Sequence, residues 1–545
     1  MKQLQQLFPS VDGNLEQRNE LVTHLKSVIN KIDALKDPSK LTLGDMPNYT
    51  EDYYNRMAQQ AVIPEKGISI NETIDELMSL VEGHRYVNQN YVANAAPLPN
   101  IASIVGNLVM VLINGNNIWD VEGPTAASAE VKITSMLSKI LGYDSNKSTG
   151  YTTWGGQGAV FNSLRFAIAR YSPDSNQTGI PNNLYVFCSE LSHYSLYKSV
   201  EATGIGINHL VRVKLNDDHS MNLDDLKEKM EEVISKGGIP IYILATMGTT
   251  DTFGIDDLEG IKNITQEFER TNSISPIYIH ADSAMGGMYA FFNDYDFVTN
   301  PLMFEPEVVE VLQVYQQKFT KMTLADSMVF DFHKLGSTPY TSSLFLVKDS
   351  ENLKYVDLDA SETPYVGNRG YGSYHTSYTL ECSRMGSAIG IYASLLALGT
   401  EGYQQLLANY IRVNILFREK LKSNFSNVAI TNDVSPITTF RFYPEAVRWE
   451  EELSGSLNTN EINRINQFNE EFAELIGLER DIVFFGNTSK LRLIQAADNQ
   501  TRLPVYAHKF FSISPYTTVE EVERYIDFLK EHMEIYRKTN ELVLV

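Results

Sequence analysis

Residues 276–287 read PIYIHADSAMGG, an apolar run that ends in an acid and two glycines. Its first four residues predict a short buried strand, because they are apolar and rich in types that favour strands. An aspartate directly after such a strand is costly to bury unless a cationic group meets it. Asp282 is therefore a candidate partner for a buried cation, with a helix cap or a metal ligand as the alternatives.

Similar apolar runs recur on both sides of this stretch. They predict strands at 184–188, 239–245, 328–330 and 344–347. Helical periodicity separates some of these runs, as it does over 223–234. Strands that alternate with helices predict an α/β fold with a mainly parallel sheet flanked by helices, and function gathers at the carboxyl ends of the strands in such sheets.

The chain divides into three predicted parts. Residues 1–110 are expected to form a helical N-terminal segment for packing or dimerisation, because prolines punctuate a polar, helical pattern there. Residues 111–390 hold the alternating pattern and form the predicted large domain. Residues 391–545 form a predicted smaller α+β domain. Its predicted strands are 437–442, 482–485 and 510–513.

The bulk composition limits the possible partners. The 545 residues are too many for one hydrophobic core. With 45 basic against 68 acidic side chains the net charge is −23, and such a surface repels nucleic acid and anionic lipid. Two cysteines exclude a disulfide framework and suit a reducing cytoplasm. No secretory signal is evident, and the most apolar stretch, 101–113, is too short to span a bilayer. We therefore expect a cytoplasmic protein that binds neither nucleic acid nor membrane.

Two further segments place glycines or a histidine near predicted strands. Residues 152–159 read TTWGGQGA ahead of a predicted helix, where backbone N–H groups and the helix dipole favour an anion such as phosphate. His193 lies just past the strand at 184–188, where an imidazole can stack on a planar ring or move a proton. Each has an ordinary alternative, since glycine-rich turns before helices are common and a lone histidine is more often structural.

Residues 326–336 read DSMVFDFHKLG, which places His333 and Lys334 just past a predicted strand. Desolvation or a cationic neighbour at this edge of the sheet can free the lysine of its proton and let it attack an aldehyde. Most lysines are solvated surface charges. The catalytic interpretation of Lys334 therefore depends on the order of the segments along the chain, in which this one follows the glycine turn, His193 and Asp282.

In this order the four segments resemble those of group II pyridoxal-phosphate-dependent amino-acid decarboxylases. The strongest matches are ATMGTT at 245–250 and the segments around Asp282 and Lys334. The resemblance implies a fold-type I pyridoxal-phosphate enzyme with a seven-stranded-type sheet. It also implies decarboxylation of an L-amino acid to its amine and CO2, by a homodimer with its active site at the subunit interface.

Within that family the chain looks most like the bacterial tyrosine decarboxylase branch. The supporting stretches are NGNN at 114–117, HKLG at 333–336 with Pro339-Tyr340, and LECS at 380–383. This likeness implies an aromatic, tyrosine-like substrate, with branched-chain and acidic amino acids as alternatives. As a departure, the family's Thr-Ser-Gly-Gly-(Ser/Thr)-Glu-Ala-Asn becomes TWGGQGAV at 153–160, which removes a hydroxyl and an acid from the glycine turn.

The resemblance also implies roles for individual residues. Lys334 would hold the aldehyde of pyridoxal 5'-phosphate as a Schiff base, Asp282 would pair with the pyridine nitrogen, and His193 would stack on the ring face. The other cofactor-binding residues would be Gly156, Gln157, Ser327 and His333 at the phosphate, Thr246 near the ring and Ala284 on its other face.

A tyrosine on a mobile loop usually supplies the proton that replaces the lost carboxylate in this family, often in the neighbouring subunit's site. The loop 362–379 contains the candidates, and its glycines allow motion. They are Tyr365, Tyr371, Tyr374 and Tyr378, with Gly367, Gly370 and Gly372. Spacing to Arg384 favours Tyr374 as the third catalytic residue beside Lys334 and His193, with His375 as the alternative.

Three other functions fit parts of the pattern. Another pyridoxal-phosphate reaction, such as C–C lyase, aminotransferase or oxidative deamination chemistry, would use the same Lys334 and Asp282. A metal-dependent hydrolase could use His193, His280, Asp282 and His333, although no HExxH pattern supports it and no metal is expected. The third is a non-catalytic homologue that acts as a binding protein, and the intact Lys334 and Asp282 argue against it.

Overall fold

The computed structural model describes residues 2–359, 361–363, 371–372, 374–432, 434–443 and 447–543. The chain forms two compact units. The first consists of Met1–Tyr91 with Gly477–Phe484, and the second of Val92–Ile476 with Phe485–Val545.

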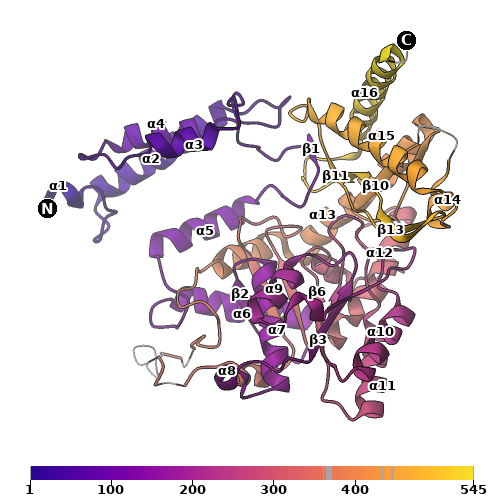
Figure 1. The fold of residues 1–545 in the computed structure, drawn as a ribbon. Coiled ribbons are helices and arrows are strands. Elements are labelled where there is room, and N and C mark those ends of the chain that lie inside the picture. The colour runs from indigo at the N-terminus through magenta and orange to yellow at the C-terminus, as the bar shows by residue number, and fades with distance from the viewer. Residues whose placement is uncertain are drawn as a thin grey trace. The chain divides into compact units, whose positions relative to one another are not determined.

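The first unit is built from helices. They are α1 (Lys2–Gln5), α2 (Leu15–Ala34), α3 (Tyr53–Gln60) and α4 (Ile70–Val81). Helices α2 and α4 lie side by side (Figure 1), and a capping box of Ser69 and Glu72 starts α4. Asp481 accepts hydrogen bonds from the backbone amides of Leu41 and Thr42, which joins its segment to this unit.

A seven-stranded sheet forms the centre of the second unit, in the order β2-β8-β7-β6-β5-β3-β4. Its strands are β2 (Thr149–Thr153), β3 (Leu184–Ser189), β4 (Leu210–Val213), β5 (Ile239–Thr246), β6 (Tyr278–Asp282), β7 (Ser327–Asp331) and β8 (Ser343–Val347). Neighbouring strands from β7 to β4 pair in parallel, whereas β8 runs antiparallel to both β7 and β2. This confirms the predicted seven-stranded, mainly parallel sheet.

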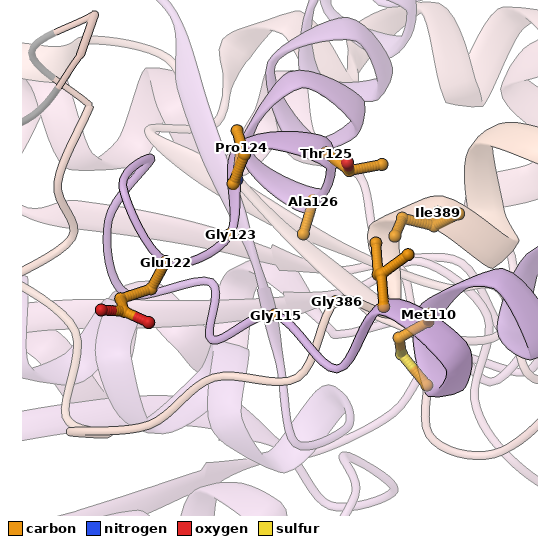
Figure 2. A pocket seen from close by; sticks show the side chains of 10 residues that line it. Met110, Gly115, Glu122, Gly123, Pro124, Thr125, Ala126, Gly386 and Ile389 are labelled. Carbon is orange, nitrogen blue, oxygen red and sulfur yellow. The ribbon is translucent and has the colours of Figure 1, made fainter. Parts of the chain in front are cut away.

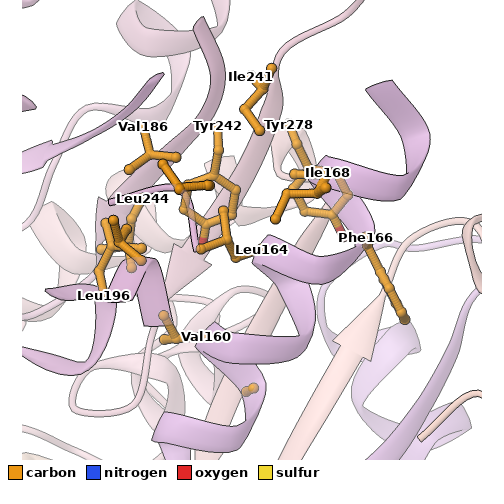
Figure 3. Close-up of a cluster of buried hydrophobic side chains, with 14 of the residues drawn as sticks. Val160, Leu164, Phe166, Ile168, Val186, Leu196, Ile241, Tyr242, Leu244 and Tyr278 are labelled. Carbon is orange, nitrogen blue, oxygen red and sulfur yellow. The ribbon is translucent and has the colours of Figure 1, made fainter. Parts of the chain in front are cut away.

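Helices cover the sheet, which explains why its central strands are almost continuous apolar runs. The helices are α6 (Pro124–Ile140), α7 (Gly156–Tyr171), α8 (Ser175–Thr178), α9 (Ser195–Thr203), α10 (Leu223–Ser235), α11 (Leu258–Asn272) and α12 (Pro306–Phe319). Every residue of β6, β7 and β8 is buried. Helix α7 packs on the sheet through Leu164 and Ile168, which lie beside Tyr242 and Tyr278 in the core (Figure 3).

Two further helices, α5 (Ile101–Ile113) and α13 (Ala388–Asn424), pack against each other. Their contact is close, because a Cβ on Gly106 would come within 2.9 Å of the Gly390 Cα. Helix α13 is broken at Gly399, whose φ of 59° and ψ of −171° are not helical. None of the helices that the structure describes is long and apolar enough to cross a membrane.

The C-terminal part of the second unit contains an antiparallel sheet. It has the strand order β11-β14-β10-β9, with β9 (Val428–Ile430), β10 (Ile437–Phe442), β11 (Phe484–Thr488) and β14 (Ala507–Phe511). A hairpin of β12 (Leu493–Ala496) and β13 (Asn499–Pro504) accompanies it. The helices here are α14 (Trp449–Leu453), α15 (Thr459–Gly477) and α16 (Val522–Val543). The short strand β1 (Tyr91–Val92) falls at the boundary of the two units in the sequence.

The strand predictions differ from the structure mainly at the strand ends. The strand predicted at 276–279 is Tyr278–Asp282, so that Asp282 is the last residue of β6 and not a residue beyond it. The C-terminal strands predicted at 482–485 and 510–513 are shifted, to Phe484–Thr488 and Ala507–Phe511. Strand β2 was not predicted, since its sequence TGYTT is polar and carries a glycine.

Candidate active site

Lys334 lies in the turn between β7 and β8, with its amine next to a buried carboxylate. The Lys334 Nζ atom is 2.8 Å from Asp331 Oδ2, and the Asp331 side chain is 2% exposed. Ser343, the first residue of β8, donates a hydrogen bond from its hydroxyl to Asp331 Oδ1. His333 Nε2 is 3.7 Å from Asp331 Oδ2. Asp331 was not predicted as a site residue, although its place at a strand end three residues before the lysine is a signal that could have found it.

These neighbours set the protonation states at the turn. Burial alone would raise the pKa of Asp331, but Lys334 and His333 outweigh it and hold that pKa below its usual value. Burial opposes the charged form of Lys334, whereas Asp331 and Asp282 favour it, and the lysine pKa is raised. Lys334 therefore carries a proton in the free site and must lose it before its amine can attack a carbonyl group.

Asp282 and His193 come to the same edge of the sheet from β6 and from the loop after β3. The Asp282 carboxylate accepts a hydrogen bond of 3.3 Å from the backbone amide of Ala284. Burial raises the pKa of Asp282 against the opposing charges of Lys334 and His193. Desolvation lowers the pKa of His193, and the Asp282 charge partly offsets that effect. Lys334, Asp282 and His193 are thus within electrostatic range of one another.

The glycine turn between β2 and α7 reaches this group of charges. Gly155 has a φ of 110°, a conformation that favours glycine, and α7 begins at Gly156. A Cβ on Gly156 would lie 2.9 Å from Asp331 Oδ2 and 3.4 Å from the Cβ of Ala284. The structure therefore brings the predicted residues Gly156 and Ala284 together with the Lys334 turn, and the first amides of α7 point their partial positive charge to this side.

The unusual residues of the turn have structural partners. The Gln157 side-chain amide donates to the Ser195 carbonyl (3.1 Å) and to the Ser199 hydroxyl (3.0 Å), which ties α7 to α9. At position 158 a Cβ would come within 2.9 Å of the Trp154 ring. Glycine at 158 is thus required by the tryptophan at 154. The Gln157 backbone amide stays available at the start of α7, whereas its side chain does not face the site.

Thr246 lies with the group, and Ser327 does not. Thr246 ends β5 directly opposite Asp282, and its hydroxyl is 2.9 Å from that of Ser192. Ser327 begins β7, so at about 3.3 Å per residue it lies roughly 13 Å along the strand from Asp331. Its hydroxyl is 2.9 Å from His280 Nδ1, so these two residues form a separate polar pair in the sheet.

Tyr374, the predicted proton donor, is bound to a buried ion pair. Its hydroxyl donates to Glu130 of α6, and Glu130 Oε2 is 2.6 Å from Arg384 Nη2. His375, the alternative donor, has its Nδ1 3.0 Å from the Ser377 hydroxyl. Within the described part of one chain, the structure joins Tyr374 to this ion pair and not to the Lys334 group. Three other predicted loop residues lie outside the described residues: Tyr365, Gly367 and Gly370.

Two tyrosine rings border the site. The Tyr340 ring lies 4.5 Å from that of His333, and its hydroxyl donates to the Ala95 carbonyl at 2.9 Å. The Tyr194 ring lies 4.1 Å from that of His193. Both tyrosines are exposed, at 59% and 60%. These two exposed rings, one beside each histidine, form an aromatic rim.

A second buried cation lies near His193. The Lys509 Nζ atom is 2.8 Å from Asp251 Oδ1 and 2.8 Å from Asn94 Oδ1, and the lysine side chain is 3% exposed. Asp251 follows β5 and is close enough to His193 to favour its charged form. Neither Lys509 nor Asp251 was predicted, because they are far apart in the sequence and no local pattern joins them.

A cavity of about 210 Å³ lies apart from these residues, between the end of α5 and the starts of α6 and α13 (Figure 2). Its wall includes Met110, Ile113, Pro124, Ala126 and Ile389. None of its lining residues belongs to the Lys334 group, so this cavity is not part of the candidate active site. Among the residues that the structure describes, no three His, Cys, Asp or Glu side chains gather into a metal-binding group.

Comparison with known proteins shows the family to which the chain belongs. Residues 47–442 match the profile of the pyridoxal-dependent decarboxylase conserved domain. The chain therefore belongs to the pyridoxal-dependent decarboxylase family, and it is a carboxy-lyase that uses pyridoxal phosphate to decarboxylate an amino acid.

The similar curated proteins act on several different amino acids. An L-2,4-diaminobutyrate decarboxylase of Acinetobacter baumannii is 24% identical over 418 residues, which is 72% of this chain and 75% of that protein. An aspartate 1-decarboxylase of Aliivibrio fischeri is 27% identical over 49% of this chain and 43% of its own. An L-tyrosine decarboxylase of Enterococcus faecium is 26% identical over 51% of this chain and 47% of its own. The family prediction is confirmed, whereas the tyrosine branch is not specifically supported.

Solved structures share the fold at low sequence identity. Mouse CSAD in its apo form has a TM-score of 0.76 at 15% identity, covering 94% of this chain and 99% of that one. Oryza sativa TDC with PLP and tryptamine has a TM-score of 0.75 at 14% identity, covering 97% and 99%. These likenesses confirm the predicted fold class.

The residues at the Lys334 turn fit the family's cofactor. An amine suits its aldehyde, a buried carboxylate suits its pyridine nitrogen, and the N-terminus of α7 suits its phosphate. Asp331 and Ala284 also lie so close to Gly156 that a larger residue has no room at this position. The donor set and the cradle therefore agree with the cofactor that the family uses.

Proposed function

We propose that the chain decarboxylates an aromatic, tyrosine-like L-amino acid at a site centred on Lys334. The observation that carries the proposal is the convergence of Lys334, Asp282, His193 and the Gly155-Gly156 turn at one edge of the sheet. When bound there, pyridoxal phosphate supplies an electron sink for the pair left by the departing CO2.

The chain's own residues hold and orient that group. Lys334 would hold its aldehyde, and the raised pKa of Asp282 marks a buried carboxylate that would gain most from a cation placed directly against it. His193 would cover one face of the ring and Ala284 the other, and Thr246 would lie near the ring. His333 and the first amides of α7, those of Gly156 and Gln157, would bind the phosphate.

Proton transfer needs a group that keeps a proton until it is required. Burial and the Glu130 charge raise the pKa of Tyr374, so its hydroxyl stays protonated at neutral pH. Within the described part of one chain Tyr374 joins Glu130 and not the Lys334 group, so we propose that it donates its proton in the site of a neighbouring subunit. The lowered pKa of His193 leaves a neutral imidazole that can take up or pass on a proton inside the site.

The aromatic rim favours an aromatic substrate. Tyr340 and Tyr194 expose their rings beside His333 and His193. Ring-to-ring contacts of this kind contribute about 0.5–1.5 kcal/mol beyond the buried area. A substrate with a planar side chain would gain this contribution, and a short acidic one would not.

An acidic substrate is the second candidate, and Lys509 favours it. A buried lysine near His193 can bind a side-chain carboxylate, but Asp251 already neutralises this cation at 2.8 Å. An acidic substrate would have to compete with Asp251 for it. The aromatic candidate therefore stands first.

The apolar surface of α5 supports a homodimer. The side chains of Ile101, Val105, Val111 and Leu112 are between 52% and 81% exposed. Exposed apolar patches on folded proteins mark interfaces, and Met110 and Ile113 at the end of the same helix line the cavity. A second copy of the chain is the proposed occupant. Light scattering should report a dimer for the wild type and a monomer for Val105→Asp, and a monomeric wild type would contradict the proposal.

Two measurements test the proposed function. Borohydride reduction followed by peptide mass spectrometry should locate the cofactor on Lys334, and the Lys334→Ala variant should lose the attachment and the visible absorbance band. CO2 release should then be compared for tyrosine, aspartate, glutamate, 2,4-diaminobutyrate and a branched-chain amino acid. Attachment at another lysine would refute the site. Fastest turnover of aspartate, with loss of that activity in Lys509→Met, would replace the aromatic proposal by the acidic one.

A further inference from the structure

Glu130 and Arg384 form a buried ion pair beside the candidate active site. Arg384 Nη2 is 2.6 Å from Glu130 Oε2, and their side chains are 2% and 0% exposed. Glu130 belongs to α6, and Arg384 lies just before α13. Neither residue belongs to the group that would touch the cofactor.

Glu130 also holds the end of β2. Its Oε2 atom accepts hydrogen bonds from the Thr152 backbone amide (2.7 Å) and the Thr152 hydroxyl (2.8 Å), and its Oε1 atom accepts the Tyr374 hydroxyl. Thr152 lies three residues before Gly155, where the turn into α7 begins. One carboxylate therefore fixes both the strand that leads into the glycine turn and the side chain of Tyr374.

Arg384 holds the same region from the other side. Its Nη1 atom donates to the Asn117 carbonyl (2.9 Å) and to the Thr376 hydroxyl (3.0 Å). The Thr376 amide in turn donates to the Ile118 carbonyl at 2.9 Å. The guanidinium thus binds the residues after Tyr374 to the segment between α5 and α6.

A buried ion pair such as Glu130–Arg384 adds little to the net stability of the fold. Two charges lose their hydration when they are buried, and their attraction often does no more than offset that loss. Removing one partner, however, leaves an uncompensated charge and is strongly destabilising. A buried pair that joins four separate segments specifies one arrangement of those segments.

We propose that Glu130 and Arg384 are positioning residues that fix the Tyr374 segment and the Gly155-Gly156 turn in a single arrangement, and thereby set the geometry in which the cofactor is bound. The inference rests on the proposed cofactor site. It adds that a pair outside the site controls how tightly and in which orientation the cofactor sits.

The chain offers a matched control in its C-terminal part. Arg441 Nη2 is 2.8 Å from Glu452 Oε1, and both side chains are fully buried. A tyrosine hydroxyl, that of Tyr443, donates to Glu452 at 2.9 Å. The control pair has the same burial and the same three groups as the proposed one, but it lies in the small domain's core and not beside the glycine turn.

The test compares Glu130→Gln with Glu452→Gln in the full chain. Both variants should lose thermal stability, because each leaves a buried arginine without its counter-charge. Only Glu130→Gln should also weaken pyridoxal phosphate binding, by about tenfold or more, and change the visible circular dichroism of the bound cofactor, which reports its orientation. Wild-type affinity and dichroism in Glu130→Gln would overturn the proposal and leave the pair a purely structural role, as would equal changes in both variants.

Two milder variants keep the test decisive if Glu130→Gln does not fold. Thr152→Val removes one of the hydroxyl groups that donate to Glu130, and Tyr374→Phe removes the other. Both variants leave the ion pair with Arg384 intact. Each should shift the cofactor dichroism, and wild-type spectra in both would refute the inference. Trapping of the cofactor on Lys334 in the wild type is unaffected by these outcomes, so a failure of the proposed site and a failure of the positioning pair are distinguishable.

Discussion

Replacing Gly156 with alanine would add one methyl group between the first turn of α7 and Asp331. The new Cβ would lie 2.9 Å from Asp331 Oδ2, 3.2 Å from Asp331 Oδ1 and 3.4 Å from the Ala284 Cβ. Gly156 is not among the glycines with a positive φ, and alanine favours a helix over glycine. Any loss of cofactor affinity in this variant therefore arises from the contacts of the new methyl group and not from backbone strain.

The size of the effect follows from how firmly Asp331 is held. Lys334 and Ser343 both bind its carboxylate, so Asp331 cannot turn away from the new methyl group without breaking one of these contacts. Inserting a methylene-sized group into a filled site costs about 1–3 kcal/mol. Because the first amides of α7 are the proposed phosphate site, a shift of this turn away from Asp331 should lower the affinity for pyridoxal phosphate about 5- to 150-fold.

Titration of the cofactor-free protein with pyridoxal phosphate, followed by visible absorbance, measures this affinity. Gly158→Ala is the matched control on the same helix, because its Cβ would also meet atoms at 2.9 Å, but those of Thr153 and Trp154. It should lower thermal stability and leave the cofactor affinity close to that of the wild type. Wild-type affinity in Gly156→Ala, or an equal loss in both variants, would refute the placement of the phosphate.

Three further predictions concern single titratable groups. Burial lowers the pKa of His508 to about 3, so the free energy of unfolding should fall by about 1.4 kcal/mol per pH unit below pH 6.5. The His508→Phe variant should lack this slope when its unfolding is measured between pH 4.5 and 7. An unchanged slope would contradict the burial argument. Burial raises the pKa of Asp256 to about 7, so the contribution of Asp256 to the free energy of unfolding is present at low pH and is lost as pH rises from 4 to 7. The Asp256→Asn variant should flatten that pH dependence in the same assay. Asp331→Asn removes the anion nearest Lys334, so the lysine pKa should fall and stopped-flow absorbance should show faster cofactor attachment at pH 7, whereas slower attachment would show that Asp331 acts only by placing the amine.

The central sheet was predictable because its strands are short apolar runs separated by helical patterns. The direction of β8 was not, since an apolar run such as 344–347 carries no mark of whether its neighbour runs with it or against it. Strand β4 (Leu210–Val213) was not predicted, because it is short and carries an arginine. Helix α5 shows another limit, because it is the most apolar stretch of the chain, yet much of its apolar surface is exposed in one chain.

The candidate site could likewise be predicted only in part. Lys334, Asp282 and His193 each follow or end a strand, and the carboxyl ends of parallel strands share one edge of the sheet, so their meeting could be foreseen. Ser327 was expected with them, but it begins β7 and so lies at the other end of that strand. Glu130 could not be found from its sequence context, because its partners come from segments more than 240 residues away as well as from nearby ones.

Because β8 folds straight back onto β7, the lysine and its carboxylate form a local unit. Asp331, Lys334 and Ser343 all lie within 331–343, whereas Asp282 and His193 reach the site only through parallel pairings with long crossovers. Hairpin contacts form within microseconds, and contacts between distant segments form later because loop closure opposes them. The amine of Lys334 and its counter-ion are therefore joined by contacts that are local in the sequence, whereas the rest of the site depends on contacts between distant segments.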